Sequence, residues 1–446
     1  MTDDNIIIGT PIGDISIPKG EVREFVVNLF ENTKKKDSAK SKHIYDFFEG
    51  VKPRGEYHQM NKHEVPAYLK CLQAVINRDY DILEIINYTS DGSAEVPIRY
   101  HDFDIGPNTK ESLLIEGCIF IQHKELGYKY TLCFETYTDN GIYVEIEAFF
   151  NSSKTNFKNL WDTVETYFDT EGPLLKQKID AKRNYIKYEK TNWGDIIIKD
   201  TLQKLLNRNI VNYIANIEEY AKRNLPTSRG ILITGPPGTG KTLCCKTLMS
   251  MVDCTAIYVT SDTIENIGDI KETYKLAKRL SPTIVIIEDI DTLGGLDRSV
   301  NGVHHPLLGE FLNSLNGVGS NSGVVTIATT NFPQHLDAAL ADRPGRFDLR
   351  LDFDLPDEGQ RLHILKKYVE DVEHNGIDLK IISKKTTGLS GAYLREIVMS
   401  SYMVALEEKT IINKKIMDDV VTTIQKMRGQ ILTDYGISKT SEVNYG

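Results

Sequence analysis

Residues 235–242 form a glycine-rich octapeptide, GPPGTGKT, whose residue types suit phosphate binding. Its glycines let the backbone approach a polyphosphate and direct N–H groups at it, while Lys241 can reach the terminal phosphates and Thr242 can ligate Mg²⁺. A short apolar run precedes this loop and a segment free of Gly and Pro follows it, which is the strand–loop–helix order that the mechanism needs. We therefore predict a nucleotide-binding loop. The predicted contacts are Gly235, Pro236, Pro237, Gly238, Thr239, Gly240, Lys241, Thr242 and Leu243.

A second group of acidic residues follows another apolar run. Glu288 and Asp289 come directly after Ile284–Ile287, and Asp291 lies two residues further on. Enzymes that hydrolyse nucleotides at such a loop need carboxylates at the end of a neighbouring strand, one for the Mg²⁺ shell and another to polarise the attacking water. The spacing predicts that these acids meet the loop.

Length and composition limit the classes of protein that fit. The chain has 446 residues, enough for about three domains. Its net charge of −10 argues against a dedicated nucleic-acid binder, and we interpret the basic run Lys34–Lys36 as a solvated segment. The six cysteines show no C-x-x-C or zinc spacing, so we expect neither a disulfide framework nor a metal site built on them. We find no signal peptide and no apolar run long enough for a transmembrane helix, and we expect a cytoplasmic protein without membrane insertion.

Residues 1–185 are predicted to form an α+β N-terminal domain. Amphipathic spacing predicts a helix over residues 64–86, and β-rich runs follow between residues 113 and 150. Further helices are expected over residues 21–31 and 156–168. Because no catalytic constellation occurs here, we predict that this domain recruits a substrate or partner.

The remaining chain divides into three parts. Residues 186–355 contain five strand candidates at βα spacing, in residues 230–234, 256–260, 284–287, 324–328 and 349–353, which predicts an α/β domain with a parallel sheet. Residues 356–430 are predicted to be helical, and residues 431–446 to form a polar tail.

From about residue 193 to residue 427, the ordered motifs resemble those of the AAA family of ATPases. Besides GPPGTGKT, the segment IVIIEDID (284–291) resembles the Walker B motif and Thr329–Asn331 the sensor-1 strand end. LDAALADRPGRFD (336–348) resembles the second region of homology, and TGLSGA (387–392) the sensor-2 segment. The resemblance implies a P-loop AAA ATPase domain with a five-stranded parallel sheet and a C-terminal helical lid. It also implies a homo-oligomeric ring, usually a hexamer, with ATP bound at subunit interfaces.

Roles for individual residues follow from the same resemblance. Asn331 would orient the attacking water, and Arg343 and Arg346 would be arginine fingers offered to a neighbour's ATP, with a local salt bridge to Asp342 or Asp348 as the alternative. By position, Glu288 would join Thr242 as a magnesium ligand and Asp289 would be the water-polarising acid. The residues expected to line the adenine and ribose are Asp195, Ile196, Gly391 and Ala392.

Three positions depart from the family pattern. The acids run Glu-Asp where most relatives have Asp-Glu, an order similar to that of the mitochondrial AAA ATPase that translocates the folded Rieske protein. Asn266 stands where many unfoldases place a pore aromatic, which argues against gripping an unfolded chain in that way. Tyr393 stands where some relatives have a sensor arginine, and we do not assign that role to Arg395.

We therefore predict an ATPase that uses ATP and Mg²⁺ in a ring to remodel, disassemble or translocate a macromolecule, expected to be a protein. One alternative is a nucleotide-gated switch or scaffold with weak turnover, favoured by the reordered acids and Asn266. Another is a nucleic-acid remodeller, but the net negative charge of the chain argues against it.

Overall fold

The computed structural model describes residues 5–10, 13–18, 38–138, 141–292, 322–332 and 347–434. The chain divides into two compact units, Met1–Ile105 with Lys110–Phe168, and Gly106–Thr109 with Asp169–Gly446. The helix predicted over residues 21–31 and the basic run Lys34–Lys36 lie outside the described residues.

The first unit contains a seven-stranded antiparallel sheet in the order β3-β9-β8-β7-β4-β5, with β6 pairing with β7. Its strands are β3 (Arg54–Gln59), β4 (Tyr80–Tyr88), β5 (Glu95–Val96), β6 (Arg99–Gly106), β7 (Thr109–His123), β8 (Lys129–Thr138) and β9 (Ile142–Phe150). Strands β8 and β9 pair antiparallel, with Thr138 opposite Ile142. Strands β1 (Asn5–Thr10) and β2 (Gly13–Pro18) pair with each other as a separate hairpin.

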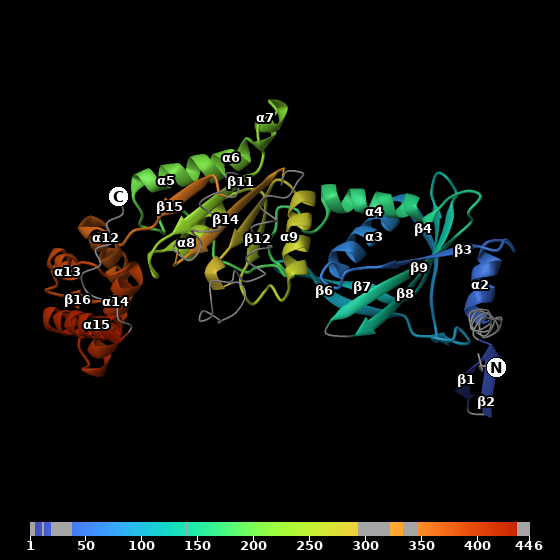
Figure 1. Cartoon of the computed structure of the whole chain (residues 1–446), viewed down its shortest axis with the longest axis horizontal. Helices are drawn as coiled ribbons and strands as arrows, with labels where there is room; N and C mark the ends of the chain where they lie inside the picture. The colour runs from blue at the N-terminus through green and yellow to red at the C-terminus, as the bar shows by residue number, and fades with distance from the viewer. Residues whose placement is uncertain are drawn as a thin grey trace. The chain divides into compact units, whose positions relative to one another are not determined.

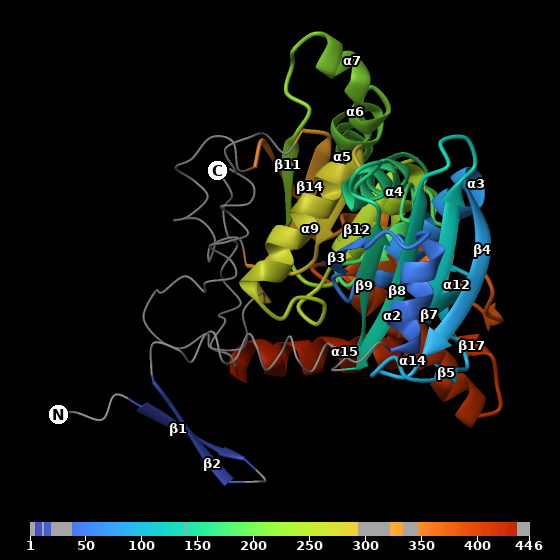
Figure 2. The ribbon, with the colours of Figure 1, turned by 90° about the vertical axis from the view of Figure 1, so that its right-hand side faces the viewer.

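Helices cover both faces of this sheet. Helix α2 (Ala39–Phe47) lies across β7 and β8, where Ile44 packs in one cluster with Phe120 (Figure 2). Alternation places Ile119 on the opposite face, where it lines a small apolar pocket together with Leu69 of α3 (Val65–Asp79). Helix α4 (Phe157–Glu171) packs on α3 through Trp161, whose ring stacks on that of Tyr68.

Helix α3 is shorter than the sequence pattern predicts. It ends at Asp79, and the residues expected to continue it to position 86 form β4 instead. The segment Tyr80–Ile86 is rich in isoleucine and pairs with His123–Cys118 of β7. Sheet pairing with a distant strand therefore overrides the helical spacing of its apolar residues.

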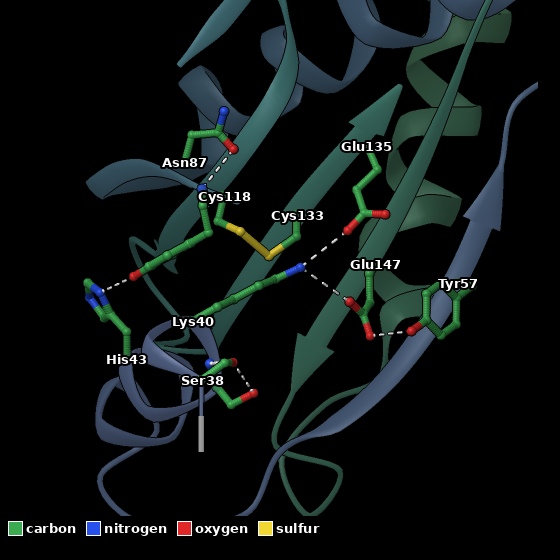
Figure 3. Close-up of a disulfide and its surroundings, with 11 residues drawn as sticks. Ser38, Lys40, His43, Tyr57, Asn87, Cys118, Cys133, Glu135 and Glu147 are labelled. Atoms are coloured by element: carbon green, nitrogen blue, oxygen red, sulfur yellow. Dashed lines mark hydrogen bonds and ion pairs between the residues drawn. A yellow bond between two sulfur atoms is a disulfide. The ribbon is translucent and has the colours of Figure 1, made fainter. Parts of the chain in front are cut away.

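A disulfide joins Cys118 to Cys133, contrary to the expectation from cysteine spacing (Figure 3). The two residues are direct cross-strand partners on β7 and β8, and both are buried under α2. The two cysteines meet because of the register between β7 and β8, and a local sequence motif does not predict that register.

The second unit contains a six-stranded parallel sheet in the order β10-β12-β13-β14-β11-β15. The five predicted strands are β11 (Arg229–Thr234), β12 (Thr255–Val259), β13 (Thr283–Ile287), β14 (Val324–Thr330) and β15 (Leu349–Asp352). A sixth strand, β10 (Lys178–Asp180), extends the edge beside β12, and it lies before the boundary predicted at residue 185. All residues of β13 and β14 are buried, as expected for central parallel strands.

Helices of the second unit pack on this sheet and share its core. The helical segments before β11 are α5 (Asp200–Leu206), the π-helical turn η1 (Asn207–Val211), α6 (Asn212–Ala215) and α7 (Ile217–Lys222). Helix α8 (Lys241–Met251) follows β11, α9 (Ile267–Arg279) precedes β13, and the 3-10 turn η2 (Ile290–Thr292) follows it. Buried side chains from η1, α8 and the strands form one cluster, including Ile210, Leu248 and Ile286.

A helical lid follows β15, in the region predicted to be helical. It consists of α12 (Glu358–Val369), α13 (Leu379–Lys385), α14 (Gly391–Glu407) and α15 (Lys414–Asp434), which gather into one bundle drawn in orange and red (Figure 1). The two-residue strands β16 (His374–Asn375) and β17 (Ile412–Asn413) pair within it. The buried guanidinium of Arg361 donates to the carbonyl oxygens of Pro356 and Ser383, which fixes the start of the bundle.

Candidate nucleotide-binding site

The glycine-rich loop lies between β11 and α8, as predicted. Gly235 and Gly238 both have positive φ angles, 144° and 77°, which favour glycine. A Cβ at Gly235 would collide with the carbonyl oxygen of Phe353, and one at Gly238 would lie 2.7 Å from Ser390 Oγ. The loop is therefore closely bounded by the end of β15 and the start of α14. The backbone N–H of Ala392 donates to Gly238 O over 3.2 Å, so the lid bonds directly to this loop.

Lys241 is buried at the first position of α8. Its Nζ donates to the carbonyl oxygens of Gly235 and Pro236 at 2.7 and 2.9 Å, and to Oδ1 of Asn331 at 2.7 Å. Burial lowers the pKa of Lys241, since desolvation disfavours the charged form. The ammonium is thus held by neutral oxygens at the point where phosphates would bring negative charge.

The ends of β13 and β14 bring the acidic residues and Asn331 to this loop. Asn331 Nδ2 donates to Asp289 Oδ1 over 3.0 Å, and the Asp289 backbone N–H donates to Thr329 Oγ1 over 2.9 Å. Asp289 has a positive φ of 45°, a conformation that aspartate tolerates better than most residues. Its pKa is raised by burial and by the nearby charge of Asp291, and it is partly lowered again by Lys241.

Glu288 precedes Asp289 in the chain and is not one of the residues in this series of hydrogen bonds. Its Oε1 is buried without a hydrogen-bond partner among the described residues, and its carboxylate lies near the hydroxyl of Tyr258 on β12. Burial and this carboxylate together raise the pKa of Tyr258. A buried carboxylate oxygen without a partner is costly unless a cation or donor meets it.

These side chains fit a bound Mg²⁺. Thr242 is exposed at the start of α8, and Glu288 offers the unsatisfied oxygen, so two protein oxygens would hold the ion. Within the described ranges, no group of three or more His, Cys, Asp or Glu is arranged to hold a metal by itself. Mg²⁺ is commonly held by one or two protein ligands together with phosphates and water.

A pocket of about 1010 Å³ opens over the loop, which is at the upper end of the size of ligand sites. Predicted residues that line it include Asp195 and Ile196 from the segment before α5, Gly391 and Ala392 from the start of α14, and Pro237, Gly238, Thr239, Gly240, Lys241, Thr242, Leu243, Asp289 and Asn331 from the sheet side. Gly235, Pro236 and Glu288 lie in the adjoining backbone turns, outside the pocket lining. The predicted arginine fingers Arg343 and Arg346 lie outside the described residues.

Several pocket residues were missed by the sequence reasoning. They come from α8, α12 and α14 and are Lys246, Ile364, Lys367, Tyr368, Arg395, Glu396, Met399 and Met403. Lys367 also donates to the backbone carbonyl of Asp195 over 2.8 Å, joining the lid to the segment before α5. The i, i+4 spacing of Arg395, Met399 and Met403 was the available signal, because it places the three on one face of α14.

Asn266 caps helix α9. Its side chain accepts from the backbone N–H groups of Gly268 and Asp269, and the carboxylate of Asp269 accepts in return from the Asn266 backbone. This reciprocal pair is a capping box. Asn266, which stands at the position of the pore aromatic, therefore uses its side chain to cap its own helix.

The topology and the site together define a P-loop nucleotide-binding α/β domain, with the ligand loop at the carboxyl ends of parallel strands. Comparison with known proteins identifies it further. Residues 231–355 match the family described as ATPase family associated with various cellular activities (AAA), and they form an AAA ATPase domain.

Relatives of known annotation extend this similarity. The chain is 35% identical over 232 residues to the proteasome-activating nucleotidase of Pyrococcus furiosus, covering 48% of this chain and 58% of the relative. It is 34% identical over 231 residues to the protein of the same name from Methanococcus maripaludis, covering 49% and 55%. The chain thus spans a little over half the length of these relatives. No helix in the described part of the chain is long and apolar enough to cross a membrane.

Proposed function

We propose that this protein hydrolyses ATP with Mg²⁺ in a homo-oligomeric ring and uses the reaction to remodel, disassemble or translocate a protein partner in the cytoplasm. The observation that carries the proposal is the hydrogen-bonded chain Lys241–Asn331–Asp289, which links the phosphate loop to the ends of two neighbouring strands. Phosphate binding, water positioning and proton acceptance would then occur at adjacent side chains.

Each side chain has a distinct part in this reaction. Lys241 would exchange one of its three neutral acceptors for a phosphate oxygen, and its charge would offset that of the phosphates. Thr242 and Glu288 would hold Mg²⁺, which supplies charge neutralisation at the phosphates when bound. Asp289 would accept a hydrogen bond from the attacking water and take its proton, with Asn331 orienting that water.

Turnover measurements test the reaction. We expect Lys241→Ala to abolish nucleotide binding, and Asp289→Asn to retain bound ATP without hydrolysing it, because the amide cannot accept the proton. Phosphate release and binding of a fluorescent ATP analogue would be measured on the full chain. Wild-type turnover by the Asp289→Asn protein would refute the assignment of Asp289.

The ring proposal rests on the AAA domain and on the predicted roles of Arg343 and Arg346. A guanidinium from a neighbouring subunit would stabilise charge on the transferred phosphoryl group. Subunits carrying Arg343→Ala and Arg346→Ala should therefore regain activity when mixed with Lys241→Ala subunits, since each damages a different half of a shared site. Absence of complementation would count against catalysis at the interface.

We infer that the partner is a protein recruited through the N-terminal region. The name of the relatives, proteasome-activating nucleotidase, supports a partner that is a protein assembly. The net charge of −10 supports a protein over a nucleic acid. A salt-dependent mobility shift with DNA or RNA would favour the nucleic-acid alternative.

A nucleotide-gated switch with weak turnover is the second candidate. The engagement of Asn266 in helix capping favours it, because this position then offers no side chain for gripping a chain. A turnover rate that stays below about one per minute with and without added unfolded protein would select the switch; stimulation by the protein would select the remodeller.

A further inference from the structure

A groove separates helices α14 and α15 on the surface of the lid, with a volume of about 490 Å³. One wall is a stripe of α14, Glu396, Ser400, Val404 and Glu408, spaced four residues apart. Residues at this spacing share one face of a helix, and the stripe is about 18 Å long at 1.5 Å per residue. We call this feature the lid groove; it matches the length of a helix of about 12 residues.

The floor of the lid groove is aliphatic. Val420 and Ile424 of α15 line it together with Val404 of α14, and Met427 at one end is 57% exposed. An apolar floor between two helices is the surface on which an amphipathic helix can lay its apolar face.

The rim of the lid groove is acidic. Glu408 and Asp419 lie on opposite walls, and neither carboxylate has an ion pair or hydrogen bond among the residues of the described lid. Asp418, the neighbour of Asp419 outside the groove, is by contrast paired with Lys385 at 2.7 Å. With Glu396 also on the rim, three carboxylates face a single cation, Lys415.

From this shape and charge we propose that the lid groove docks a cationic amphipathic helix of a protein partner. The aliphatic face of that helix covers Val404, Val420 and Ile424, and its flanking Lys or Arg side chains pair with Glu408 and Asp419. Because these carboxylates lack partners in the described lid, each pairing gains charge attraction without breaking an existing ion pair. The proposal concerns binding alone and does not depend on ATP turnover.

The test uses the full chain and a synthetic helical peptide. The peptide carries leucines on one face at positions i, i+4 and i+7 and lysines on both flanks, and a second peptide of the same composition is scrambled so that the leucines share no face. Fluorescence anisotropy would measure both peptides against the wild type, a Glu408→Lys/Asp419→Lys variant and a Glu407→Lys variant. Glu407 is an exposed acid next to Glu408 that does not line the groove, so its variant controls for a charge reversal outside the groove.

We expect the amphipathic peptide to bind the wild type and Glu407→Lys similarly, and to bind Glu408→Lys/Asp419→Lys at least tenfold more weakly. We also expect a peptide with Glu in place of Lys to prefer the double variant. Equal binding to all three proteins, or equal binding of the scrambled peptide, would overturn the proposal. So would a lower oligomeric state of the double variant with no peptide binding by the wild type, because a second copy would then occupy the groove. Sedimentation velocity and circular dichroism would establish oligomeric state and folding for each variant.

Discussion

The ammonium of Lys241 lies 2.7 Å from the side-chain oxygen of Asn331, whose amide donates in turn to Asp289. With the carbonyls of Gly235 and Pro236, Asn331 completes three acceptors for the three N–H donors of the lysine. A phosphate that binds Lys241 must therefore displace one of them. If Asn331 is displaced, its side chain becomes available to a water molecule beside Asp289.

Replacement of Asn331 separates binding from hydrolysis. In Asn331→Ala, Lys241 keeps two loop carbonyls and its route to the phosphates, so we expect the affinity for ATP to change less than threefold. Turnover should fall about 100-fold, since the attacking water loses its orienting group. Isothermal titration calorimetry and phosphate release would measure the two effects. Loss of ATP binding would indicate instead that Asn331 positions Lys241.

The length of the Asp289 side chain fits the position that its backbone conformation gives it. At a φ of 45°, aspartate is tolerated, and its Oδ1 already lies 3.0 Å from Asn331 Nδ2. Asp289→Glu would carry the carboxylate past this partner, so we expect turnover to fall by about tenfold rather than rise. An increase in the rate of phosphate release would contradict this expectation.

The pH dependence of turnover should depend on Asp291. The pKa of Asp289 is raised above its usual 3.8 by burial and by the charge of Asp291, and Asp289 must be ionised to accept a proton. Asp291→Asn removes one of the charges that raise this pKa, so the acidic limb of the pH–rate profile should move to lower pH. A limb that stays in place, measured under saturating ATP, would indicate that another group sets it.

Helix α9 should lose stability when its cap is removed. Asn266→Ala deletes the acceptor for the N–H groups of Gly268 and Asp269, at a cost of about 1 kcal/mol in the free energy of unfolding. Asn266→Ser retains a capping oxygen and serves as the control. Urea unfolding followed by circular dichroism would compare them, and equal midpoints would contradict the capping role.

On the face of the antiparallel sheet that α2 covers, two carboxylates of like charge are direct cross-strand neighbours. Glu135 and Glu145 are directly opposite each other on β8 and β9, and Lys40 lies 3.4 Å from Glu135 (Figure 3). Like charges in this relationship are destabilising, so Glu145→Gln should stabilise the protein by about 0.5 kcal/mol and Lys40→Gln should destabilise it. Both effects should diminish in 1 M salt, as thermal unfolding would measure.

The features that the sequence predicts correctly are those that depend on residues close together in the chain. The loop 235–242 and the five apolar strand runs predict the parallel sheet, and adjacent strand ends then bring Asp289 and Asn331 to Lys241. Each of these inferences needs only a motif and the rule that ligands bind at the carboxyl ends of parallel strands.

The parts that were missed depend on distant pairing. Lys367 and Met399 enter the pocket only because the lid packs back on the loop, and Cys118 meets Cys133 only through strand register. Likewise, Ile82 and Ile85 satisfy a helical spacing, yet pairing with β7 places them in a strand. Tertiary contacts of this kind leave little trace in a single sequence.

The hydrogen bond from the Ala392 N–H to Gly238 O connects the phosphate loop directly to the lid. The peptide of Gly238, which would border a bound polyphosphate, also accepts this hydrogen bond from the first turn of α14. A shift of this peptide on phosphate binding would therefore move the first turn of α14 through one hydrogen bond.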